Sequence, residues 1–93
     1  MPKNAIKQRR IRAKERAAEI LIRAGYKIIP SDNSLVCLFA VRKTEWRAVR
    51  IALDEITKKD ELLIREIPAP VNCSREIWLK RLNVKDFEIR EIA

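Results

Sequence analysis

The chain has 93 residues, of which 47% are hydrophobic and 37% charged, and its formal net charge is +8. This length allows one small core and excludes a second one, and the hydrophobic fraction excludes a disordered chain. We therefore expect residues 1–93 to form a single domain. Because a core of this size is marginal alone, we also expect a bound partner or self-association, with a homodimer as the simplest form.

Composition also bears on location and cofactors. No apolar run approaches the length of a membrane span and no secretion signal is visible, so we expect a cytoplasmic protein that does not associate with membranes. Cys37 and Cys73 are too few for a disulfide scaffold and lack metal-ligand spacing, so no metal and no cofactor are predicted. Cys37 lies in an apolar run and reads as a small core residue. The many isoleucines and the absence of histidine are typical of thermophiles.

Residues 5–24 predict one long helix. It ends before Gly25, the only glycine, which suits the left-handed residue that follows a helix end. Its apolar stripe consists of Ile6, Ala13, Ala17, Ile20, Leu21 and Ala24. On the opposite side we expect Arg9, Arg12, Arg16 and Arg23. Glu15 falls beside apolar neighbours, where a half-buried carboxylate would need a basic partner.

The next segments read as strands. Residues 26–30 predict a short strand, followed by turn residues 31–33. Residues 35–41 form an unbroken apolar run, which predicts a central strand covered on both faces. After a charged hairpin connection at residues 42–45, residues 46–53 alternate. Arg47, Val49 and Ile51 are expected on the core face, and Arg50 on a second face lined by small residues that leave open space.

The last elements are less regular. Residues 57–66 predict a short helix with Thr57 as its N-cap and Asp60 three positions later. Pro68 and Pro70 end it. Residues 74–82 fit either a helix or a strand, and we choose a strand because three bulky apolar residues follow one another there. A final strand is predicted for residues 86–92.

The positive charge is concentrated at one end. Residues 1–23 hold eight Lys and Arg against Glu15 and Glu19, a net charge of +6, whereas residues 54–93 hold eight against nine acids. A basic surface at one end favours a polyanion such as DNA or RNA. The simpler alternative is a solvated helix face without a ligand.

Three motifs follow one another in the first half. A basic helix carries RAKER at residues 12–16, the segment CLFA occupies residues 37–40, and AVR occupies residues 48–50. In order and spacing they resemble the PD-(D/E)XK nuclease superfamily, within it the archaeal Holliday-junction resolvases and related restriction-type nucleases. The resemblance implies an α+β (α/β) fold with a small restriction-endonuclease-like mixed sheet. Its element order is α-β-β-β-α-β-β, with the N-terminal helix packed on the sheet.

The metal-binding residues of that family are not matched. The resemblance places Cys37 and Ala48 at the positions of the metal-binding aspartate and glutamate, and Arg50 at that of the lysine. A thiol is a poor ligand for Mg²⁺, alanine offers no ligand, and arginine stays protonated. Glu15 alone is retained, so these four residues describe a vestigial pocket in which Glu15 would balance Arg50.

Three functions are therefore open. The leading one is a catalytically inactive nuclease-like domain that binds nucleic acid, DNA in preference to RNA, without a metal. Its expected contacts are Lys3, Lys7, Arg9, Arg10, Arg12, Arg16, Arg42, Lys43, Arg47 and Arg50. The second is a protein-interaction or assembly module with an apolar interface and no nucleic-acid binding. The third is a metal-dependent DNA endonuclease with relocated carboxylates.

Overall fold

The computed structural model describes residues 3–31, 37–68 and 71–92. Its elements follow the order predicted from the sequence. They are α1 (Lys3–Arg23), β1 (Lys27–Pro30), β2 (Leu38–Arg42), β3 (Glu45–Leu53), α2 (Lys58–Arg65), β4 (Cys73–Lys80) and β5 (Glu88–Ile92). The strands form one mixed sheet in the order β1-β2-β3-β4-β5. Strands β3 and β4 run parallel, and the other neighbouring pairs run antiparallel.

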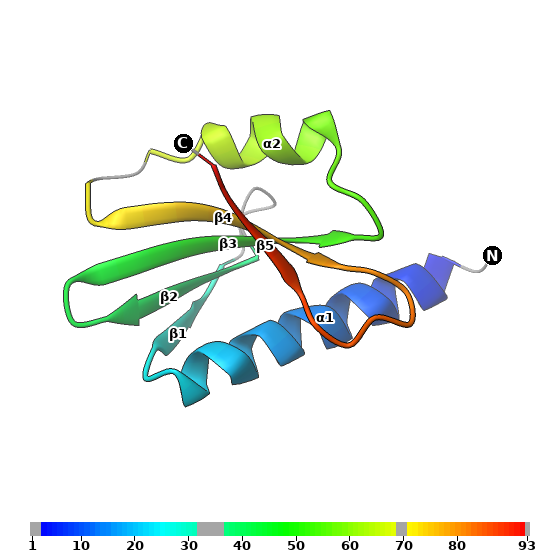
Figure 1. Cartoon of the computed structure of the whole chain (residues 1–93), viewed down its shortest axis with the longest axis horizontal. Coiled ribbons are helices and arrows are strands. Elements are labelled where there is room, and N and C mark those ends of the chain that lie inside the picture. The colour runs from blue at the N-terminus through cyan, green and yellow to red at the C-terminus, as the bar shows by residue number, and fades with distance from the viewer. Residues whose placement is uncertain (1–2, 32–36, 69–70, 93) are drawn as a thin grey trace.

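The two helices cover opposite faces of this sheet (Figure 1). Helix α1 packs on β1, β2 and β3, and α2 packs on β3, β4 and β5. A crossover between parallel strands needs a long connection, and here α2 supplies it. The α1-side core contains Ala13, Ala17, Leu21, Tyr26, Leu38, Ala40, Val49, Ile51 and Trp78. The α2-side core contains Ala48, Ala52, Ile64, Ile67, Ile77, Leu79 and Ile92.

Helix α1 buries a narrower stripe than its sequence predicts. Ala13, Ala17 and Leu21 are buried, but the predicted stripe residues Ile6 and Ile20 are 48% and 36% exposed. The buried side chains described on α1 therefore form a single row with a spacing of four residues. The helix ends as predicted. Gly25 follows it with a φ of 93°, a left-handed conformation that glycine adopts without strain.

The prediction of an interior strand at residues 35–41 is confirmed, because β2 lies between β1 and β3, whereas the middle strand of the five is β3. Strand β2 begins at Leu38, and residues 35 and 36 lie outside the described part of the chain. The alternation predicted along β3 is confirmed, because Val49 and Ile51 face α1 and Ala48 faces α2. The open space expected beside Arg50 is absent, since α2 covers that face.

The predicted cap and the uncertain strand are both confirmed. The Thr57 side chain accepts a hydrogen bond from the Asp60 N–H at 3.1 Å, and Asp60 accepts one from the Thr57 N–H at 3.0 Å. This capping box starts α2. The segment that fitted either a helix or a strand forms β4, because Ile77 and Leu79 contact one core while Trp78 contacts the other.

Candidate nucleic-acid interface

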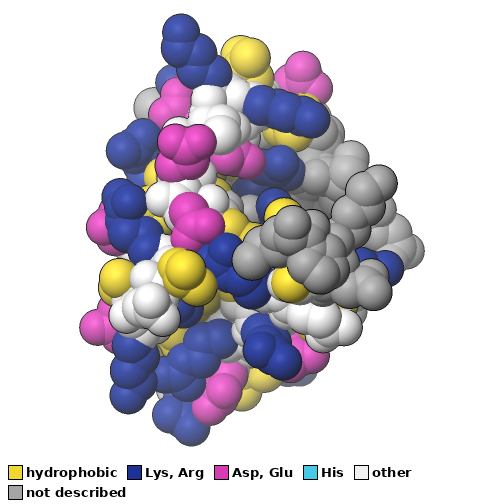
Figure 2. All heavy atoms as spheres, turned by 90° about the vertical axis from the view of Figure 1, so that its right-hand side faces the viewer, with side chains coloured by type: hydrophobic (Ala, Val, Ile, Leu, Met, Phe, Trp, Pro, Cys, Tyr) yellow, Lys and Arg dark blue, Asp and Glu magenta, His cyan; other side chains and the backbone are white. Residues whose placement is uncertain are grey.

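The basic residues of α1 other than Arg10 lie to either side of its buried stripe. At 100° per residue, Arg9, Arg12 and Arg16 fall on the flank beside the end of β3. Lys7 and Lys14 fall on the other flank, where Lys14 lies near Ile28 of β1. Figure 2 views the end of the molecule where α1 begins, and Lys and Arg side chains gather at its lower left. The sequence predicted this basic end, but not its division into two flanks.

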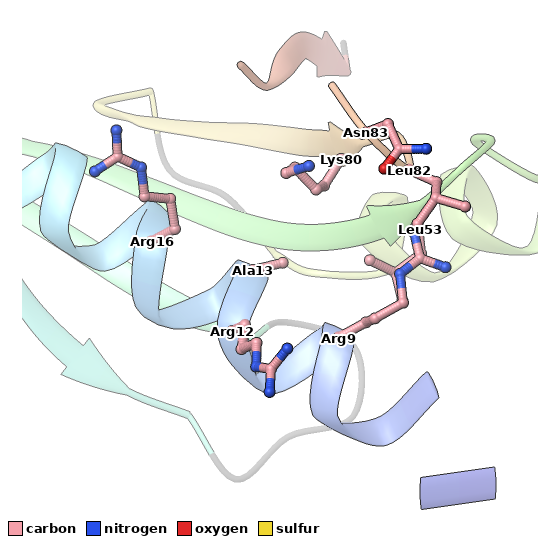
Figure 3. A pocket seen from close by; sticks show the side chains of 8 residues that line it. All are labelled: Arg9, Arg12, Ala13, Arg16, Leu53, Lys80, Leu82 and Asn83. Carbon is pink, nitrogen blue, oxygen red and sulfur yellow. The ribbon is translucent and has the colours of Figure 1, made fainter. Parts of the chain in front are cut away.

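The first flank borders a hollow of about 260 Å³, shown in Figure 3. Its walls come from α1, the end of β3, the end of β4 and the loop that follows β4. The lining residues are Arg9, Arg12, Ala13, Arg16, Leu53, Lys80, Leu82 and Asn83. None of these described lining residues is acidic. We call this feature the basic hollow.

Lys80 and Asn83 were not among the predicted contacts. They belong to the half of the chain that is nearly neutral, so the charge count gave no signal for them. Parallel pairing of β3 and β4 sets Lys80 beside Leu53, which brings it next to the arginines of α1. The Lys80 Nζ donates to two backbone carbonyls, at Arg81 and Val84, and has no carboxylate partner within the described chain.

Arg9 is the lining arginine that forms a close ion pair. Its two terminal nitrogens donate to both oxygens of Asp54, at 3.0 and 2.9 Å. The hydrogen bond from Arg9 is the main reason that the pKa of Asp54 lies below its ordinary value, and the Leu82 N–H adds to it. Asp54 lies just outside the hollow and ties α1 to the β4–β5 loop.

Arg12 and Arg16 form weaker interactions within the protein than Arg9 does. Arg12 is exposed and makes no hydrogen bond or ion pair with any described residue. Arg16 lies 3.5 Å from Glu19, but that carboxylate also pairs with Arg23 at 2.8 Å. Cations with weak or shared partners keep most of their attraction for an incoming anion.

Several other predicted contact residues serve the fold instead. The Arg10 guanidinium donates to the Ile51 carbonyl at 3.0 Å, and Arg42 donates to the Ala24 carbonyl at 3.0 Å. Arg42 also pairs with Glu45 at 3.1 Å. Lys43 is exposed in the β2–β3 turn, away from the basic hollow. Lys3 begins α1, and its side chain lies outside the described part of the structure.

Arg47 and Arg50 are held by carboxylates inside the protein. Arg47 donates to both oxygens of Glu76, at 2.8 and 2.5 Å, on the α1 side of the sheet. Arg50 is only 9% exposed, and its Nε donates to Asp60 at 3.0 Å on the α2 side. Neither arginine can reach a large polyanion without leaving its carboxylate. Their expected contact with nucleic acid is therefore not supported by their positions.

Glu76 is the centre of a buried polar network. Its oxygens also accept hydrogen bonds from Ser74 Oγ at 2.6 Å and Trp78 Nε1 at 2.9 Å. Burial raises the pKa of the Glu76 carboxyl, but the donors Arg47, Ser74 and Trp78 lower it by more. The net pKa lies below the ordinary value, so this carboxylate stays ionised and holds Arg47 in place.

The four residues of the predicted vestigial pocket do not converge. Glu15 is exposed on α1, so its predicted half-burial is wrong. Cys37 packs against the α1-side core and its sulfur accepts the Ile51 N–H at 3.4 Å. Ala48 and Arg50 face α2, on the other side of the sheet. Among the described residues, no three His, Cys, Asp or Glu side chains are placed to hold a metal ion.

Glu15 therefore does not balance Arg50, and Asp60 takes that role. The capping box fixes Asp60 at the start of α2, directly over Arg50 on β3. The sequence predicts open space on that face of β3, and therefore no helix that would give Arg50 a partner. The sequence identifies Asp60 as part of the helix cap, but it does not predict that the other carboxylate oxygen accepts a hydrogen bond from Arg50.

Comparison with known proteins adds no family. No family model matches this chain, and no curated protein matches it. In the described part of the structure, neither helix is long and apolar enough to cross a membrane.

Proposed function

We propose that this domain binds nucleic acid, DNA in preference to RNA, through the basic hollow and the adjoining flank of α1. The observation that carries the proposal is the set of cations around an acid-free hollow. Arg12 has no ion-pair partner among the described residues, Arg16 shares a distant one, and Lys80 contacts only carbonyls. Such cations attract phosphates and release counterions when they bind them.

The distribution of charge over the whole chain supports the same function. The net charge is +8, and residues 1–23 contribute +6 of it, from eight Lys and Arg against two Glu. A field of one sign at one end steers a polyanion toward that end. Contacts from long Arg and Lys side chains to phosphates position the protein but do not read base sequence. We therefore propose backbone-directed binding with little sequence preference.

Binding rather than cleavage is proposed because the positions of the nuclease resemblance are dispersed. Glu15 is exposed on α1, whereas Ala48 and Arg50 lie beneath α2. The resemblance to the PD-(D/E)XK superfamily contributes an expected partner, DNA.

The test is a fluorescence-anisotropy titration at low salt with labelled duplex, branched and single-stranded DNA, and with RNA. Removing two hollow cations in Arg12→Gln/Arg16→Gln should weaken duplex binding by about tenfold, and lower the salt slope by about 0.9 for each phosphate that is no longer neutralised. The matched control is Lys58→Gln/Lys59→Gln on α2, which removes the same charge from the other face of the sheet.

Two results would decide against the proposal. Absence of binding by the wild-type domain to every probe at low salt would remove the function altogether. Equal loss in the two double variants would show that total charge, rather than the basic hollow, governs binding.

A second candidate function is self-association through an apolar flank. Ile11 and Ile22 on α1 are 40% and 58% exposed. Ile11 borders a second hollow with Ala18, Ile28 and Leu38, and Lys14 and Glu15 complete its described lining. A homodimer would cover these side chains and leave the arginine flank open. Light scattering across a concentration series measures it, with Ile11→Ser/Ile22→Ser expected to shift a dimer to monomer.

A further inference from the structure

Asp54 lies at the edge of a hollow whose described lining has no acid of its own. It is the residue after β3, and its backbone has a left-handed φ of 67°. That conformation turns the chain toward α2 and directs the carboxylate at α1. Both carboxylate oxygens are then taken by Arg9, at 3.0 and 2.9 Å. One of the nearby cations is therefore neutralised from inside the protein.

This ion pair is exposed, so it is a weak restraint. The Asp54 side chain is 51% exposed and the Arg9 side chain 25%. Exposed pairs between long side chains contribute little to stability and weaken with salt. A phosphate group, like a carboxylate, presents two oxygens that can accept hydrogen bonds from two N–H groups of one guanidinium. Arg9 can therefore exchange one anion for another.

The basic hollow has the chemistry of an anion site. The stems of Arg12 and Arg16 line one wall, with their guanidinium groups directed to different sides, and Lys80 and Asn83 lie on the other wall (Figure 3). Its volume of about 260 Å³ holds a tetrahedral oxyanion with several waters, each of which occupies about 30 Å³ in the liquid. The apolar floor of Ala13 and Leu53 reduces competition from solvent.

We propose that the basic hollow is a seat for a phosphate group, and that Asp54 is an internal acid which competes with that phosphate for Arg9. This inference rests on the proposed function, because the first phosphate considered is one of a nucleic-acid backbone. A free phosphate presents the same oxygens to the same donors. Asp54 thus lowers the affinity of the seat for phosphate. While Asp54 holds Arg9, a bound phosphate has one cation fewer to contact.

The decisive variant is Asp54→Asn. Asparagine tolerates the left-handed conformation well. Its side-chain oxygen can still accept the Leu82 N–H, which lies 2.9 Å from Asp54 in the wild-type protein. The substitution therefore keeps the loop tether and removes the negative charge beside Arg9, which also attracts Arg81. Glu55→Gln is the matched control, since it adds the same net charge at the next residue, which is exposed.

Binding of a labelled 20-base-pair DNA duplex is measured by anisotropy for the four combinations of Asp54→Asn and Arg9→Gln. We expect Asp54→Asn to bind about threefold to tenfold more tightly, with the salt slope steeper by about 0.9. Glu55→Gln should improve binding by less than about twofold. In the Arg9→Gln background, Asp54→Asn should improve binding no more than Glu55→Gln does. Thermal unfolding of each variant verifies that it is folded.

The outcomes separate this inference from the proposed function. If wild-type protein binds duplex and Asp54→Asn improves binding no more than Glu55→Gln, the seat with its internal acid is wrong while nucleic-acid binding stands. An improvement that persists without Arg9 overturns it equally. If wild-type protein binds no nucleic acid, the proposed function fails, and inorganic phosphate then tests the seat alone.

That second arm uses NMR of the arginine Nε–H groups during a titration with inorganic phosphate. Shifts at Arg12 and Arg16 that saturate at lower phosphate in Asp54→Asn than in Glu55→Gln support a seat for free phosphate. Identical titrations, or no shifts at all, overturn the seat for this source.

Discussion

The basic hollow beside α1 and the interior of the sheet both gather arginines, but they differ in what stands next to each guanidinium. In the interior, Arg47 has Glu76 and Arg50 has Asp60, each within 3.0 Å. Around the hollow, Arg12 has no such partner in the described structure. The interior carboxylates are themselves fixed, Glu76 by two further donors and Asp60 by the capping box.

This difference shows that a count of basic residues overstates the surface that can bind. Burial makes an unpaired charge very costly, so a buried arginine needs a carboxylate or backbone carbonyls next to its guanidinium. At the surface, water screens the charge, and a cation can remain without a partner. An anion in solution is therefore attracted mainly by the surface cations that have no carboxylate partner.

The largest expected effect follows from removing an interior carboxylate. Glu76→Gln leaves Arg47 partly buried without a counter-charge and loses one strong acceptor. We expect the free energy of unfolding in urea to fall by about 3 kcal/mol, as for other broken buried pairs. The control is Glu91→Gln, on the β5 residue that pairs in register with Glu76 but is exposed.

The control should change stability by less than about 0.5 kcal/mol. Equal stability of Glu76→Gln and wild-type protein would show that the Arg47–Glu76 pair does not support the fold. Arg47 would then count among the cations that can bind an external anion, and only Arg50 would remain as an arginine that stabilises the interior.

Acid should reveal the same distinction with a smaller effect. The pKa of Glu76 lies below its ordinary value of 4.5 in the folded protein, because its donors outweigh the effect of burial. A depressed folded pKa adds stability that is present above the ordinary value and is lost as pH falls through the folded one. Over that window the unfolded chain binds the proton more readily. We therefore expect the urea midpoint to decline below about pH 4.5.

The pKa of Asp60 is also lowered, since its hydrogen bonds with Thr57 and Arg50 overcome burial, so its contribution has the same sign. Urea midpoints measured from neutral pH downwards give the curve. Glu76→Gln should flatten it, and an unchanged slope in that variant would exclude Glu76 as a source of the acid sensitivity.

The sequence predicted the order of elements well and the site only in part. Periodicity and turn residues located both helices and all the strands, because these signals are local. The capping pair of Thr57 and Asp60 was found for the same reason. The partners of Arg47 and Arg50 were not found, because each pair joins segments that only the β3–α2–β4 crossover brings together.

The basic hollow has the same limitation. Arg12 and Arg16 were identified from the charge of the first helix, but Lys80 and Asn83 carry no local signal. Their place depends on the parallel register that sets Leu53 beside Lys80. Asp54 reads as an ordinary acid after a strand, and only its pairing with Arg9 gives it a role.

The smallest expected effect is the one that best sharpens the comparison. Arg12→Gln/Arg16→Gln removes two cations that repel their neighbours on α1 and has little packing to lose. We expect the free energy of unfolding to change by less than about 0.5 kcal/mol and to rise slightly at low salt, where repulsion is screened least. A rise that disappears as salt is added would identify repulsion as its cause. Urea unfolding at low and high salt measures both values.

A loss above about 1 kcal/mol would mean that these arginines stabilise the fold as Arg47 and Arg50 do, and reduced DNA binding by the variant would then reflect damage to the structure. Unchanged stability together with weakened binding is the result that separates a binding surface from an interior.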